Sequence, residues 1–306
     1  MKRIPIAAAL SAATALLAAA LVPPASATPQ SSATVCSLRV GTVSAGGDLK
    51  VQNIAATSPP SVTSTWNGPK GLYQPEDWRL FGSVATEVGV AGQDRHGYVT
   101  NDTSLYSYSY RTDGSYQVLD PGSYKQTKIG GGWTRGMTYF DSSSYYNTGG
   151  TVHRSNVYAL WDGVIWRWSA GWKVTLFRGF DAVKTMTLIS ATPTYETFLA
   201  NLKGGSLYMI RIPVASNAVP VVKPVRTRTW QGFETLIAER CGSQSTLLLG
   251  IDKDTNSGYL YAVSHANGTA TVIKGLGKVT GADFTGVAQA RVFNNDLDSS
   301  ANLNGD

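Results

Sequence analysis

The segment NVYALWDGVIWRWS (156–169) decides the fold class. Two runs of β-branched and aromatic residues flank Asp162-Gly163, a dipeptide that favours a two-residue hairpin turn, so the segment predicts antiparallel strands at 156–161 and 164–169. Extended stretches lie on both sides, and we expect 133–141 to form the preceding, inner strand and 173–178 the following, outer strand. Together these residues predict a sheet of four short strands.

The rest of the chain has the same character. It is rich in Gly, Ser, Thr, Tyr, Trp and Val, and no window shows sustained 3.6-residue periodicity bounded by helix caps. Short β-branched and aromatic runs alternate with clusters of Gly, Asn, Asp and Pro, which is typical of many short strands joined by turns. We therefore predict an all-β protein.

Two sequence markers recur about every 50 residues, a spacing that suits a propeller blade of four strands. The first is a Leu or Ile after a polar or glycine-rich turn, usually followed by an aromatic residue: Leu49, Leu105, Ile165, Leu207 and Leu260. The second is an aromatic residue expected to open an inner strand: Trp78, Trp133, Phe180, Phe233 and Phe284. Each marker occurs five times, which predicts a five-bladed β-propeller of four-stranded antiparallel blades. The alternative is a large β-sandwich with accidental spacing.

Two further units can be divided into strands in the same way. We expect strands at 180–190, 196–202, 206–212 and 219–225, and then at 233–240, 246–251, 259–264 and 270–275. The chain begins at 37–44 with a second strand and finishes at 284–292 with an inner strand. These two fragments would complete one blade, so pairing of the N- and C-terminal strands would close the ring.

Cys36 and Cys241 are the two cysteines of the chain. In the predicted register they lie on one face of adjacent blades, and we expect a disulfide between them in an oxidising compartment. Two free thiols are the alternative.

Residues 1–27 have the three parts of a cleavable secretion signal. Lys2 and Arg3 precede an apolar, alanine-rich stretch, and Ala25-Ser26-Ala27 supplies the small-residue cleavage site. We expect a secreted, extracellular protein with a short tail at 28–34, a propeller at 35–294 and a polar tail at 295–306. No later run is apolar enough to span a bilayer, so no stable membrane association is expected.

Charge argues against a nucleic-acid surface. Removal of Lys2 and Arg3 lowers the formal charge from +6 to +4, and no run of Lys or Arg concentrates it. The three histidines, His96, His153 and His265, lack metal-ligand spacing, so neither a metal nor a cofactor is expected.

The glycines before an aromatic residue, as in Ile129-Gly-Gly-Gly-Trp133, and the strands Gly205-Ser-Leu-Tyr208 and Gly258-Tyr-Leu-Tyr261 resemble the tachylectin-type five-bladed β-propeller lectins. The resemblance spans most of residues 36–293. It implies non-catalytic binding of N-acetylated amino sugars, on cell-wall or glycoprotein glycans, at several similar sites between neighbouring blades. We expect a monomer.

Exposed aromatic rings suit sugar binding because the C–H faces of a sugar stack on them. Trp133, Trp172 and Trp230, at turns or strand starts, are the candidate ligand contacts. The alternative functions are a protein-binding scaffold and an extracellular glycoside hydrolase, which would need two facing carboxylates in the central funnel. The candidate carboxylates are Asp77, Glu87, Asp181, Glu234 and Asp283.

Overall fold

The computed structural model describes residues 35–73, 78–89, 92–101, 103–133, 136–151, 153–215, 217, 219–295 and 302–306, with only the backbone for 78–81. The expected signal segment 1–27, the tail 28–34 and Asp77 lie outside the described residues. Within these ranges the elements are strands and two short 3-10 turns, η1 (Ala170–Trp172) and η2 (Gly268–Ala270), so the prediction of an all-β protein is confirmed. No helix in the described part has the length and hydropathy needed to cross a membrane.

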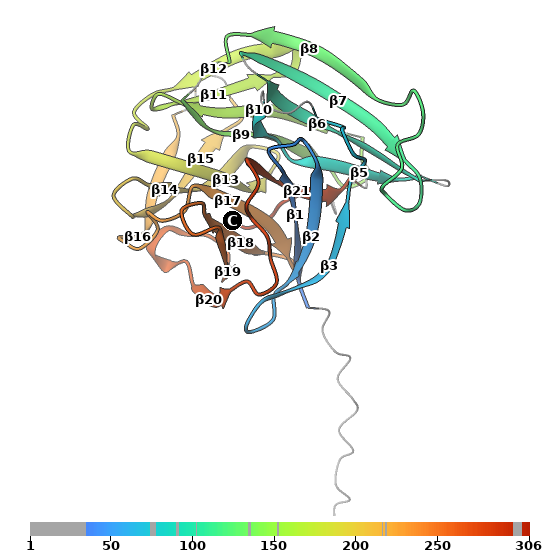
Figure 1. Cartoon of the computed structure of the whole chain (residues 1–306). Helices are drawn as coiled ribbons and strands as arrows, with labels where there is room; N and C mark the ends of the chain where they lie inside the picture. Colours follow the sequence, from blue (N-terminus) through green and yellow to red (C-terminus); the bar gives the residue numbers. More distant parts are fainter. Residues whose placement is uncertain are drawn as a thin grey trace, which may run out of the picture. The chain divides into compact units, whose positions relative to one another are not determined.

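Three sheets are each built from four consecutive antiparallel strands, which gives a propeller-like arrangement (Figure 1). The first holds β9 (Met137–Tyr146), β10 (His153–Trp161), β11 (Val164–Ser169) and β12 (Lys173–Phe177). The second holds β13 (Val183–Ala191), β14 (Tyr195–Leu202), β15 (Leu207–Pro213) and β16 (Val221–Arg226). The third holds β17 (Thr235–Cys241), β18 (Ser245–Asp252), β19 (Ser257–Val263) and β20 (Ile273–Lys278).

The remaining strands form one nine-stranded sheet. One part of it is antiparallel and combines β3 (Ser61–Asn67), β2 (Leu49–Ala55), β1 (Ser37–Val43) and β21 (Ala288–Asn294). The other part contains β5 (Val84–Val88), β6 (Gln93–Asn101), β7 (Ser104–Thr112) and β8 (Lys125–Gly131), with β4 (Trp78–Phe81) paired to β6. A parallel pairing of β21 with β5 joins the two parts.

The first and last strands pair as predicted, because β1 lies antiparallel to β21 with Gly41 opposite Ala290. The innermost strands of the sheets also contact one another in sequence. Strand β9 contacts β13, β13 contacts β17, β17 contacts β21, and β21 contacts β4 and β5. Contacts between β4 and β9 complete the cycle.

The hairpin that decides the fold class forms as expected. Trp161 lies opposite Val164, and both turn residues have positive φ, 47° for Asp162 and 69° for Gly163. That conformation matches the right-handed twist of the flanking strands and is readily adopted by an Asp-Gly pair. The expected strand 164–169 coincides with β11.

The inner strands begin later than predicted. Trp133, Phe180, Phe233 and Phe284 all lie in the loops before β9, β13, β17 and β21, two to four residues ahead of the first strand residue. The prediction that an aromatic residue opens the strand is therefore wrong for these four copies, whereas Trp78 is the first residue of β4 as predicted. Their rings are buried in the clusters between sheets, so they hold the loop in place and are not part of the ladder.

The predicted disulfide between Cys36 and Cys241 is present, with the two Cα atoms 5.6 Å apart. Cys241 ends β17, and Cys36 immediately precedes β1. The bridge therefore ties the sheet that contains both the first and last strands to the sheet β17–β20. It closes a loop of more than 200 residues, which restricts the unfolded chain.

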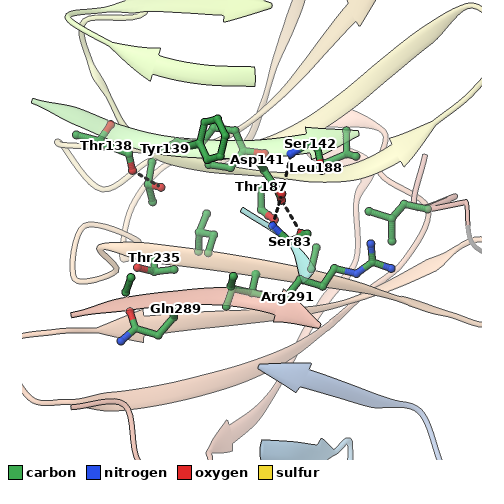
Figure 2. A pocket seen from close by; sticks show the side chains of 18 of the residues that line it. Ser83, Thr138, Tyr139, Asp141, Ser142, Thr187, Leu188, Thr235, Gln289 and Arg291 are labelled. Atoms are coloured by element: carbon green, nitrogen blue, oxygen red, sulfur yellow. Dashed lines mark hydrogen bonds between the residues drawn. The ribbon is translucent and has the colours of Figure 1, made fainter. Parts of the chain in front are cut away.

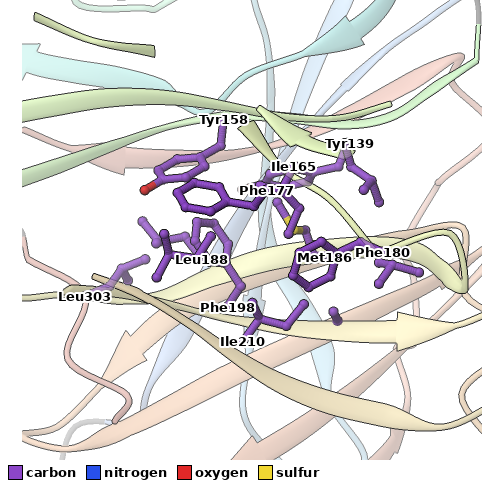
Figure 3. Close-up of a cluster of buried hydrophobic side chains, with 14 residues drawn as sticks. Tyr139, Tyr158, Ile165, Phe177, Phe180, Met186, Leu188, Phe198, Ile210 and Leu303 are labelled. Carbon is purple, nitrogen blue, oxygen red and sulfur yellow. The ribbon is translucent and has the colours of Figure 1, made fainter. Parts of the chain in front are cut away.

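The hydrophobic core lies between neighbouring sheets. One cluster joins Tyr158 and Ile165 of β10 and β11 to Met186, Phe198 and Ile210 of β13, β14 and β15 (Figure 3). The alternation of side chains along each strand explains this arrangement, because a sheet flanked by sheets on both faces must bury both.

Candidate functional site

The inner strands enclose a small polar cavity (Figure 2). Its volume is about 70 Å³, and β9, β13, β17 and β21 supply most of its lining. Thr138, Thr185 and Thr235 stand at corresponding places near the starts of three of these strands. Small-molecule pockets usually measure about 300–1,000 Å³, whereas a water molecule takes about 30 Å³ of the liquid. The cavity can therefore hold a few water molecules but not a sugar ring.

Asp141 is the one acidic residue among the described residues that line this cavity. Its carboxylate accepts hydrogen bonds from the backbone N of Ser83 at 2.7 Å, the Ser83 hydroxyl at 2.9 Å and the backbone N of Ser142 at 2.8 Å (Figure 2). Burial raises the pKa of the Asp141 carboxyl. Asp141 was not among the candidate residues predicted from the sequence. One signal in the sequence could have indicated it. Asp141 lies three residues after Thr138 in an inner strand, and the residues three after Thr185 and Thr235 are the apolar Leu188 and Ala238.

None of the four described carboxylates proposed for a hydrolase lines the central cavity. Glu234 accepts a hydrogen bond from Lys184 Nζ. Asp283 forms an ion pair with Lys50 at 2.5 Å, and the hydrogen bond from Lys50, together with those from Thr285, lowers the pKa of Asp283 to about 2.

The other two carboxylates are also placed away from the cavity. Glu87 accepts a hydrogen bond from Asn295 Nδ2 at 3.1 Å. Asp181 is exposed in the loop before β13. The pairing of carboxylates that glycoside hydrolysis requires is therefore not formed at the cavity by the residues that the sequence analysis named.

Residues 302–306 pack against the sheets, so this part of the expected polar tail at 295–306 belongs to the folded unit. Leu303 is 4% exposed and lines the central cavity. The backbone N of Gly305 donates to the Ile189 carbonyl at 2.8 Å, and Asp306 Oδ2 accepts a hydrogen bond from Arg211 at 2.7 Å. Hydrogen bonds of this kind let a polar segment pack against the sheets, which is why its polar composition did not mean exposure to solvent.

The three candidate tryptophans differ in exposure. Trp133 is 8% exposed and Trp230 is 4% exposed, so neither offers a ring face to a ligand. Trp172 is 39% exposed and lies edge-on to Tyr98, with the ring centroids 6.1 Å apart. Of the three, Trp172 alone has a ring that a sugar can reach.

Trp133, Phe180, Trp230 and Val279 occupy one position of the repeat, which we call the loop position. The backbone N of each donates a hydrogen bond of 2.8 to 3.0 Å to a backbone carbonyl of the preceding sheet. The accepting residue always lies two positions before the Leu or Ile of the first sequence marker. The four acceptors are Thr103, Gly163, Gly205 and Gly258. The second sequence marker was therefore misaligned in two copies, because Trp230 and Val279 take this place and not Phe233 and Phe284.

A large groove, here called the first groove, opens between the sheets β9–β12 and β13–β16. Its volume is about 520 Å³. The buried residues Phe177, Phe180 and Ile210 line the floor, and the half-buried Tyr208 lies beside them. Arg178 is the one charged residue of the groove. Phe177, Phe180 and Ile210 also belong to the buried cluster in Figure 3, so the floor of the groove is continuous with the core.

A second groove lies between the loop before β21 and the sheet that contains β1 and β2. Its volume is about 270 Å³, and Asp48, Lys50, Asn67, Lys70 and Asp283 are among its lining residues. Lys50 follows the marker Leu49 as Tyr208 follows Leu207. The two grooves therefore occur at corresponding places in the repeat, between the loop into an inner strand and the start of the third strand.

No protein-family model and no curated protein matches the chain. Among solved structures, an α-L-arabinofuranosidase from Podospora anserina in complex with cellotriose is similar, with 10% identity and a TM-score of 0.46 over 76% of this chain and 83% of that one. The SapL1 lectin in complex with α-methyl fucoside is similar at 12% identity and a TM-score of 0.40, over 79% of this chain and 80% of that one.

Proposed function

We propose that the chain is a secreted, five-bladed β-propeller that binds carbohydrate without catalysing a reaction. The observation that supports this best is a pair of grooves, each lined by the loop into an inner strand and by the start of the third strand beside it. A scaffold that presents grooves at more than one place in its repeat is suited to recognising repeated glycan units, because several weak contacts then act together.

The count of five rests on dividing the nine-stranded sheet at its one parallel pairing. Strands β21, β1, β2 and β3 then form one blade, and β5 to β8 form another. With the three separate sheets this makes five blades of four strands. The cycle of contacts among the inner strands is the arrangement that a closed ring requires.

Secretion rests on the expected signal at 1–27 and is compatible with the disulfide between Cys36 and Cys241. Disulfides form and persist mainly in oxidising compartments such as the cell exterior. Edman sequencing or intact mass of the exported protein tests this part of the proposal, and a product that retains residues 1–27 would contradict it.

The grooves offer the chemistry that sugar binding needs. The half-buried Tyr208 ring can stack against the C–H face of a pyranose, and the Arg178 guanidinium can donate to hydroxyl or acyl oxygens. In the second groove, Asp48, Asn67 and Lys70 supply acceptors and donors for hydroxyls. Trp172, exposed outside both grooves, remains a candidate contact.

The hydrolase alternative would need a second acid beside Asp141, and none of the four described candidate carboxylates lines that cavity. We therefore favour recognition over hydrolysis.

A glycan array tests the proposal, with the protein starting at residue 28 and hydrolysis products monitored in the same samples. We expect retention on N-acetylated amino sugars, weakened at least tenfold by Tyr208→Ala, without product release. Tyr145→Ala is the matched control, because Tyr145 is also half-buried but lines neither groove. Product release would favour the hydrolase, and retention of no glycan would favour a protein-binding scaffold.

A further inference from the structure

The loop position carries tryptophan at two interfaces between sheets. The Trp133 ring lies 4.7 Å from that of Trp168, and the Trp230 ring lies 4.8 Å from that of Tyr261. Both partners lie on the third strand of the following sheet. In the repeat, Trp168 corresponds to Ile210 of the first groove, and Tyr261 corresponds to Tyr208. At these two interfaces an indole therefore fills the space next to the third strand.

At the first groove the loop position carries the smaller Phe180. Its ring is buried with Phe177 and Ile210 on the floor (Figure 3), and the space beside Tyr208 belongs to the groove. The same fold thus presents a filled and an unfilled version of one interface. The filled version shows which chemical group the interface accommodates: a flat aromatic ring that packs against the third strand.

We propose that the first groove binds an aromatic ring, carried as a substituent on a glycan, in the place that the indoles of Trp133 and Trp230 take at the corresponding interfaces. This inference rests on the proposed function, since the ring is taken to belong to the bound sugar. It names the ligand class of that groove as an aryl-substituted glycan.

The lining of the groove favours such a ligand over an unsubstituted sugar. Arg178 and Tyr208 are the polar side chains among its described lining residues, and the others are apolar or glycine. An unsubstituted pyranose would bring several hydroxyls into this surface, and a hydroxyl buried without a partner costs free energy. Arg178 gives the groove a positive charge, so a ring that bears a carboxylate is matched to it and a cationic ring is not.

Calorimetry with three β-glycosides of N-acetylglucosamine tests the proposal: methyl, 4-nitrophenyl and 4-carboxyphenyl. We expect both aryl glycosides to bind more than tenfold more tightly than the methyl glycoside, because burying only about 60 Å² of apolar ring surface is worth about a factor of ten. Arg178→Gln is expected to weaken binding of the 4-carboxyphenyl glycoside more than binding of the 4-nitrophenyl glycoside.

One substitution is designed to fill the first groove, and another is designed to empty the interface that Trp230 fills. Phe180→Trp places in the first groove the residue that the corresponding loops already carry, so it is compatible with the fold and is expected to abolish the aryl preference. Trp230→Phe is expected to open an additional aryl-binding groove next to Tyr261 and so to raise the number of aryl glycosides bound per chain. Tyr145→Ala is expected to change neither.

Equal affinity of the wild-type protein for the methyl and aryl glycosides would overturn the ring proposal and leave carbohydrate binding in place. An aryl preference that survives Phe180→Trp would also overturn it. Binding of free 4-nitrophenol, with no glycan retained on the array, would instead remove the carbohydrate function while leaving a ring-binding groove.

Discussion

Replacement of Leu303 by alanine tests whether residues 302–306 belong to the folded unit. Leu303 is 4% exposed and lies at the border of a cavity of about 70 Å³. Leu-to-Ala changes at buried sites cost about 2–5 kcal/mol, and the cost is larger where the surroundings do not collapse into the space. We expect a loss of about 3 kcal/mol in the free energy of unfolding, because the rigid inner strands around the cavity limit such relaxation.

Urea unfolding followed by tryptophan fluorescence measures this loss as a lower midpoint at an unchanged m value. Val88→Ala is the control, because Val88 is 73% exposed and surface substitutions usually change stability by less than about 0.5 kcal/mol. A loss for Leu303→Ala as small as that of the control would refute the packing of residues 302–306 against the sheets.

Four further predictions concern single features. Replacing both cysteines by serine should lower the free energy of unfolding by about 2–5 kcal/mol, and the addition of a reductant should then no longer affect the unfolding curve. Trp230→Ala should cost about 3–5 kcal/mol in the same assay, since the ring is almost fully buried between sheets. Because the pKa of Asp283 is lowered to about 2 in the folded state, its contribution is present above about pH 4 and is lost as the pH falls toward 2; pH-dependent unfolding of Asp283→Asn should lack this loss, which is below about 1 kcal/mol for so exposed a pair. The pKa of Asp141 is raised, so this group favours the folded state at low pH and loses that effect as the pH rises through its folded pKa; Asp141→Asn should remove this pH dependence, and a variant whose pH profile matches the wild type would contradict the assignment.

The regular parts of the fold could be predicted because their signals are local. The Asp162-Gly163 turn and the alternating runs beside it specify β10 and β11 without help from the rest of the chain. The pairing of β1 with β21 followed from counting strands in each repeat. The starts of the inner strands were misplaced, because the sequence does not distinguish an aromatic residue that is buried in a loop from one that is buried in a strand.

The candidate site could not be read from the sequence to the same extent. Trp133 and Trp230 were chosen as exposed rings, but the packing of neighbouring sheets buries them, and only the three-dimensional arrangement reveals this. Phe180 and Tyr208 form the groove from two adjacent sheets, and their common position is apparent only once backbone hydrogen bonds align the repeats. Asp141 was missed because the inner strands were aligned on misplaced aromatic residues, so that Asp141 could not be compared with Leu188 and Ala238.

The sheet that joins β1, β2 and β3 to β21 has a consequence for the order of folding. Val40 and Arg291 are neighbours in the ladder, although 250 residues separate them in the chain. The N-terminal strands therefore stay without their inner partner until nearly all of the polypeptide has been synthesised, and closing so long a loop slows folding. The sheet that contains β1 is therefore completed only after β21 has been synthesised, whereas the sheets β9–β12, β13–β16 and β17–β20 need no strand from the N-terminal part of the chain.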